Sequence, residues 1–74
     1  MAKKMKYAVV IEKSASGYAA YVPDLPGCVA AGDSREETQR LIREAIEFHI
    51  EGMRAHGETV PEPSASAEYV TISA

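Results

Sequence analysis

Apolar and polar residues alternate along two short segments near the N-terminus, and this alternation predicts β-strands. In residues 6–12 the odd-numbered apolar side chains share one face, and the even-numbered side chains share the other. Residues 18–22 have a similar length and composition. The small and polar residues 13–17 between them predict a hairpin loop, in which Gly17 adopts a positive φ. The short apolar segment 28–31 predicts a third strand.

The period of the pattern changes to that of a helix after Ser34. Ser34 and Glu37 fit a capping box, in which Ser34 caps the amide of Glu37 and the Glu37 side chain reaches back to Ser34. We expect a helix over residues 35–56 that ends at Gly57. Its buried stripe, at spacings of three and four, comprises Leu41, Ile42, Ala45, Ile46, His49 and Met53. Its outer face offers ion pairs at i,i+4, namely Glu36–Arg40, Arg40–Glu44 and Arg43–Glu47.

The C-terminal part predicts a connector followed by a last strand. Residues 57–67 contain two prolines and favour an extended connector, and the alternating residues 68–73 predict a strand. After a basic leader at residues 1–5, the order is β-β-β-α-β in one domain, residues 1–74. A right-handed crossover would place the last strand parallel to the first. We therefore expect an α+β fold with a four-stranded mixed sheet, order 3-2-1-4, and one helix on one face.

Composition indicates that such a domain needs a partner. The chain has 74 residues, a net charge of −3 and one cysteine, so no internal disulfide supports its small core. The predicted sheet has one face without a helix, and we expect a homodimer or a higher even oligomer to cover it. Apart from the leader there is no basic cluster of the kind that binds nucleic acid. No apolar run reaches the roughly 18 residues of a membrane span, so we expect a cytoplasmic protein with a reduced Cys28.

The residues that could carry catalysis do not form a recognisable site. A metal-dependent nuclease needs several carboxylates on one side of a sheet. The acidic residues here are expected in turns, at a strand end and on the outer helical face, so we predict no catalytic residue, metal or cofactor. His49 lies within the buried stripe and is interpreted as a core or edge histidine. The chain is accordingly not expected to be an enzyme, and a residual metal-dependent nuclease is the least favoured alternative.

Several motifs taken together resemble the HicB antitoxin family over residues 6–72. They are YAVVIE at 7–12, VPDLPGC at 22–28, GDS at 32–34 and GETVPEP at 57–63. The resemblance implies a reduced ribonuclease-H-like fold that has lost nuclease activity. It also implies a partner, a HicA-like toxin that is small, basic and cleaves RNA, which the antitoxin neutralises by direct binding. An acidic domain suits a basic partner, because complementary charge speeds association.

The resemblance does not decide which residues contact the toxin or whether the chain binds DNA. We expect the turn residues Asp24, Leu25, Pro26 and Gly27, together with Asp33, to contact the toxin, with Leu25 as the apolar anchor. Many family members carry a C-terminal DNA-binding domain, whereas this chain stops at Ala74 after the last predicted strand. This places DNA binding in doubt, unless the chain is a fragment or the basic leader substitutes. The alternative function is an orphan HicB-like binding or scaffold protein without a toxin.

Overall fold

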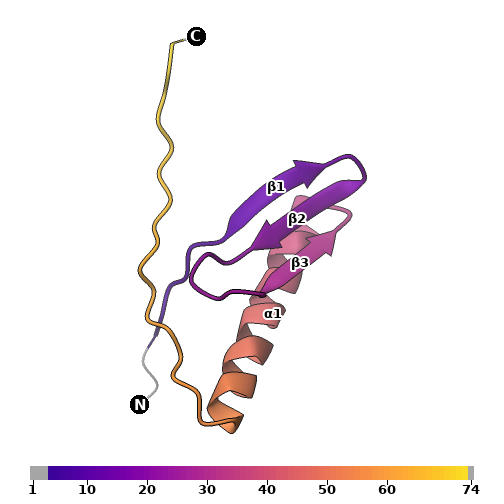
Figure 1. The fold of residues 1–74 in the computed structure, drawn as a ribbon. Coiled ribbons are helices and arrows are strands. Elements are labelled where there is room, and N and C mark those ends of the chain that lie inside the picture. The colour runs from indigo at the N-terminus through magenta and orange to yellow at the C-terminus, as the bar shows by residue number, and fades with distance from the viewer. Residues whose placement is uncertain (1–3, 74) are drawn as a thin grey trace.

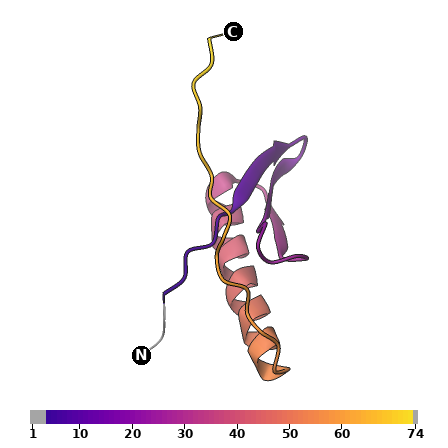
Figure 2. The same cartoon turned by 60° about the vertical axis from the view of Figure 1, so that its left-hand side comes forward.

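Three antiparallel strands and one long helix form the folded part of the protein. The structure is a computed structural model that describes residues 4–73. Its elements are β1 (Val10–Ser14), β2 (Gly17–Tyr21), β3 (Val29–Gly32) and α1 (Arg35–Ala55). The strands form one sheet in the order β1-β2-β3, and α1 covers one of its faces (Figures 1 and 2). The predicted α+β class is confirmed. Residues 1–3 of the predicted leader lie outside the described residues.

In the first hairpin, the first strand is shifted toward the C-terminus relative to the sequence-based prediction, and the second begins one residue earlier, at Gly17. Val10 pairs with Tyr21 and Ser14 with Gly17, so the strand begins at Val10 and the loop has two residues instead of five. The chain before Val10 has no strand opposite it. Beyond Tyr21, the Val22 amide donates instead to the Cys28 carbonyl, at 3.2 Å. The turn that follows takes the chain away from β1.

Gly17 serves close packing and does not supply the positive φ that the sequence suggested. Among the described glycines, only Gly27 and Gly57 have positive φ. A Cβ atom built on Gly17 would lie 2.4 Å from the carbonyl oxygen of Gly32, which is closer than real Cβ contacts come. Glycine is therefore required where β2 passes the end of β3, because any larger residue would force the two backbones apart.

The connection between β2 and β3 consists of two consecutive tight turns. The Leu25 amide donates to the Val22 carbonyl at 3.1 Å, and the Cys28 amide donates to the Leu25 carbonyl at 3.0 Å. Gly27 has φ 83°, the value that the third position of a type II turn requires. The type II turn that Pro26 and Gly27 predict is therefore confirmed.

The core lies between the sheet and α1. Ile11, Ala20 and Ala30 are opposite one another across the three strands and belong to the apolar cluster under the helix. The buried members of this cluster are Ala20, Val22, Leu25, Cys28 and Ile42. Burial raises the pKa of the Cys28 thiol, which keeps it protonated and unreactive. Cys28 thus acts as a small apolar core residue, as the sequence suggested.

The helix begins at Arg35, as predicted, and ends at Ala55, one residue before the predicted end; its N-terminal cap differs in one contact. The Glu37 amide donates to Ser34 Oγ at 3.1 Å, which confirms the cap. The Glu37 carboxylate, however, accepts from the amide of Asp33, at 3.2 Å, and not from Ser34. Thr38, which is fully buried, adds a hydrogen bond from its hydroxyl to the Ser34 carbonyl at 2.8 Å. At the other end Gly57 has φ 71°, the left-handed conformation that commonly ends a helix.

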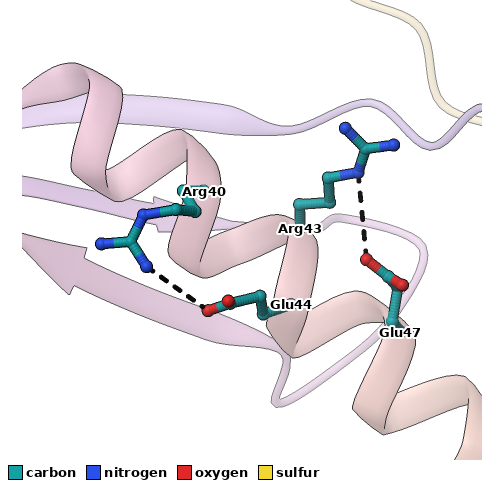
Figure 3. Close-up of polar contacts among 4 residues, drawn as sticks. All are labelled: Arg40, Arg43, Glu44 and Glu47. Atoms are coloured by element: carbon teal, nitrogen blue, oxygen red, sulfur yellow. Dashed lines mark ion pairs between the residues drawn. The ribbon is translucent and has the colours of Figure 1, made fainter.

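Ion pairs line the outer surface of α1. Arg40 and Glu44 lie 3.8 Å apart, and Arg43 and Glu47 lie 3.9 Å apart (Figure 3). Both pairs were predicted from their i,i+4 spacing. All four side chains are well exposed, so each pair stabilises the helix by only about 0.3–0.5 kcal/mol.

The predicted fourth strand does not form. Residues 68–73 carry no hydrogen-bonded strand partner, and the sheet is three-stranded and antiparallel where a four-stranded mixed sheet was expected. The segment is drawn out beyond the sheet in both views (Figures 1 and 2). Alternation of apolar side chains gives a segment the ability to join a sheet, but pairing also requires the chain to lie against a free edge. Here it passes the start of β1 and continues away from it.

The cap at Ser34 can be tested by its removal. We expect Ser34→Ala to lower the free energy of unfolding by about 0.5–2 kcal/mol, because the first turn loses its side-chain acceptor. Urea denaturation followed by circular dichroism measures the loss. Ser66→Ala, in the exposed connector, is the matched control and should change stability by less than about 0.5 kcal/mol. Equal effects of the two substitutions would contradict the role of the cap.

Candidate interaction surface

The turn between β2 and β3 is tied to the C-terminal connector by one carboxylate. Asp24 accepts hydrogen bonds from the Ser64 amide at 2.9 Å, the Ser64 hydroxyl at 2.8 Å and the Ala65 amide at 3.0 Å. The bond from the Ala65 amide, and then the two bonds from Ser64, hold the pKa of Asp24 below its ordinary value. The predicted site residue Asp24 therefore already has partners within its own chain.

A second contact holds the connector beside the N-terminal segment. The Tyr7 hydroxyl donates to the Pro61 carbonyl. The pKa of Tyr7 is raised, mainly by partial burial and to a smaller extent by the nearby charge of Glu62. The phenol therefore stays protonated and able to donate. Together with the Asp24 bonds, this contact explains why the proline-rich connector follows a defined path without being a helix or a strand.

The other predicted site residues do not form one patch. Leu25 is 1% exposed and packs into the core, so in this conformation it cannot be the apolar anchor of an interface. Pro26 and Gly27 are exposed. Asp33 is also exposed, but it follows β3, whereas the turn precedes β3. The four residues of β3 therefore separate Asp33 from the turn by about 13 Å.

An open apolar surface lies between these two ends. Across the strands Val10, Tyr21 and Val29 are in register on the face of the sheet opposite to α1. Tyr21 is 43% exposed and Val29 is 64% exposed. A shallow hollow on this face is lined by Glu12, Ala19, Ala20, Tyr21, Val29, Ala30 and Ala31. We call the surface around Tyr21 and Val29 the open face.

Sequence reasoning predicted that one face would be uncovered, but it did not include Tyr21 or Val29 among the site residues. The alternation within residues 18–22 and 28–31 was the available signal. It placed these side chains opposite to the buried ones, but the register that sets them side by side comes from the structure.

Within residues 4–73 the structure shows no group of three or more His, Cys, Asp or Glu side chains that could hold a metal ion. His56 Nδ1 lies 2.8 Å from the Gly52 carbonyl oxygen, a contact within the helix end. In the same part of the chain no helix is long and apolar enough to cross a membrane. What the described surface offers chemically is an apolar face flanked by carboxylates, which suits protein recognition.

Comparison with known families places this chain in a class of proteins. Residues 7–73 match the family described as the HicB-like antitoxin of bacterial toxin–antitoxin systems. The chain therefore belongs to the HicB-like antitoxin family, as its motifs indicated. This is a family of antitoxins and not of enzymes.

Individual relatives extend over bacteria, archaea and a phage. A UPF0150 protein of Thermoplasma acidophilum is 41% identical over 71 residues, covering 95% of this chain and 100% of that protein. An antitoxin HicB of Photorhabdus laumondii is 33% identical, covering 92% of this chain and 49% of that protein. An uncharacterised 14.9 kDa protein of Haemophilus phage HP1 is 44% identical, covering 89% of this chain and 50% of that protein. The chain thus spans about half the length of the last two relatives.

A solved structure supports the same class. A chain of the HicA3 and HicB3 toxin–antitoxin complex superposes with a TM-score of 0.70 at 32% sequence identity. The superposition covers 81% of this chain and 70% of that chain.

Because Leu25 is buried, its truncation should act on stability. We expect Leu25→Ala to lower the free energy of unfolding by about 2–5 kcal/mol, through lost burial and the cavity left behind. The midpoint of urea denaturation measures this loss. Pro26→Ala in the same turn exposes no new cavity and is the control, with an expected change below about 1 kcal/mol. A stable Leu25→Ala protein would show that this side chain is not a core residue.

The bonds to Asp24 predict an acid-dependent stability. Because the pKa of Asp24 is lower in the folded state, its contribution is fully present above its ordinary value of 3.8 and is lost as the pH falls through the folded value. The melting temperatures of wild type and Asp24→Asn should therefore differ near pH 6 and converge once the pH is below the folded pKa of Asp24. A constant difference at all pH values would contradict an ionised acceptor at this position.

Proposed function

We propose that this protein is an antitoxin that neutralises a HicA-like toxin, a small basic RNA-cleaving protein, by direct binding. The observation that carries the proposal is membership of the HicB-like antitoxin family over residues 7–73. The similarity to a chain of a toxin–antitoxin complex supports it. The net charge of −3 suits a basic partner, since opposite charges accelerate encounter.

The toxin-binding surface that the geometry favours is the open face. An interface needs large apolar or aromatic side chains at its centre and charge around them. Tyr21 and Val29 supply the apolar centre, and Glu12 lies beside them. Pro26 and Gly27 lie beyond one end of β3, and Asp33 lies beyond the other. In this arrangement Leu25 holds the turn in place from beneath, and the toxin contacts the exposed residues of the turn.

The same proposal has two further parts. We infer that the unit is a reduced ribonuclease-H-like fold, for which the β-β-β-α order and the single-sided helix are the support. We also infer action in the cytoplasm, because a toxin that cleaves RNA exerts its effect there.

Binding can be tested with the product of a small basic open reading frame adjacent to the gene. Co-expression with wild type should restore growth, and the purified proteins should form a complex. Tyr21→Ala should raise the Kd about tenfold or more, mainly through faster dissociation. Phe48→Ala, which removes an aromatic side chain 79% exposed on α1, is the control and should leave the Kd within about twofold.

The outcomes separate the candidate functions. Toxicity that persists beside folded wild type would overturn the antitoxin proposal and favour the orphan binding protein. If Tyr21→Ala restores growth as well as wild type does, the antitoxin function is supported, but the toxin binds another surface. Cleavage of RNA or DNA by the protein alone, in Mg²⁺ or Mn²⁺, would favour a residual nuclease.

The electrostatic part of the proposal has its own test. Asp33→Lys should slow association by about threefold or more, and the effect should shrink as ionic strength rises, because steering by exposed charges is screened by salt. Stopped-flow measurements at several salt concentrations provide the rates. Glu58→Lys makes the same charge change beyond the opposite end of α1 and serves as the control. Equal slowing by both would indicate net charge alone and no contact at Asp33.

A further inference from the structure

The edge of β1 that faces away from β2 has no strand beside it. Within residues 4–73 the sheet consists of β1, β2 and β3, and β1 is bonded to β2 alone. A free edge presents a row of unpaired amide and carbonyl groups, which makes it a template for another strand. The edge has no proline and no bulge, since β1 pairs with β2 over five residues in register, and its charged residues Glu12 and Lys13 lie in its second half.

Next to this edge the core is open. The helix packs mainly against β3 and β2 and least against β1, which leaves a groove between β1 and α1. The groove has a volume of about 1160 Å³. Its floor is apolar, with Val9 and Ile11 from the N-terminal segment and β1, and Ile42, Ile46 and Ile50 from α1. A fourth strand beside β1 would lie over this groove and complete the core.

The C-terminal segment has the properties of the missing strand. Residues 68–73 are drawn out and exposed, and their large apolar side chains contact little: Tyr69 is 97%, Val70 73% and Ile72 74% exposed. In an extended chain Val70 and Ile72 share one face. Six extended residues span about 20 Å, which is enough to cover the five residues of β1. The chain thus contains an unpaired strand and an unpaired edge.

The segment nevertheless leaves its own sheet. Ser64 and Ala65 are held by Asp24, and Ala67, Glu68 and Tyr69 pass one end of the groove. The last part of the chain then runs clear of β1 in both views, toward the end marked C (Figures 1 and 2). Val70 and Ile72 are largely exposed in their own molecule and are therefore available to another.

We propose that residues 68–73 pair with the free edge of β1 in a second copy of this chain, and that the exchange is reciprocal. A two-fold axis then pairs both edges and both segments at once, in a closed dimer. Val70 and Ile72 enter the groove of the second copy.

The first experiment measures mass without any toxin, so its outcome does not depend on the proposed function. Light scattering at about 50 μM should give twice 8.0 kDa for wild type. Val70→Asp with Ile72→Asp should convert the protein to monomer, raising the dimer Kd at least tenfold. Thr71→Asp with Ser73→Asp adds the same charge to the opposite face of the segment and should leave the dimer largely intact. Circular dichroism verifies that α1 is present in each.

The second experiment distinguishes exchange from closure within one chain. In a Cys28→Ala background, chains with Glu12→Cys are mixed with differently tagged chains carrying Thr71→Cys. Both positions lie on the face opposite to the groove, and a short bismaleimide should join the two kinds of chain. A doubly substituted chain that cross-links only within itself would overturn the proposal. So would a monomeric wild type, or a dimer that survives Val70→Asp with Ile72→Asp.

Discussion

A single helix covers the sheet, and its position determines which surfaces of the molecule remain open. The helix lies over β3 and β2, where its Ile42 is buried in one cluster with Leu25 and Cys28. This placement follows from the short link between Gly32 and Arg35, because the capped first turn begins directly after β3 ends. The helix therefore covers β1 least of the three strands. The apolar groove beside β1 and the open face around Tyr21 are both consequences of this one arrangement.

Most of the fold could be predicted because its determinants are local. Ser34 marks the helix start, Gly57 its end, and Pro26-Gly27 a type II turn, each through the chemistry of a few neighbouring residues. The limits of β1 could not be predicted in the same way. They depend on where β2 stops pairing, which the hydrogen bond between Val22 and Cys28 decides. The role of Gly17 likewise depends on the distant Gly32 carbonyl and not on its own φ.

The candidate site was less predictable, since it depends on which way side chains point. Leu25 lies in a turn between exposed residues, and its sequence environment gives no sign that it is 1% exposed. Asp24 looked like a free surface charge until its contacts with Ser64 and Ala65, forty residues away, were known. In the same way residues 68–73 have the pattern of a strand, but only the three-dimensional path shows that they leave their own β1 edge unpaired.

The contact between Asp24 and the connector also has a kinetic consequence. It joins residues about forty positions apart, whereas the hairpin and α1 are stabilised by near neighbours. Closing a long loop costs chain entropy, and segments that are held by exposed hydrogen bonds and few buried contacts open first under native conditions. The carboxylate can therefore release Ser64 and Ala65 while the sheet and helix stay folded. We therefore expect the amide hydrogens of Ser64 and Ala65 to exchange with solvent before those of the core.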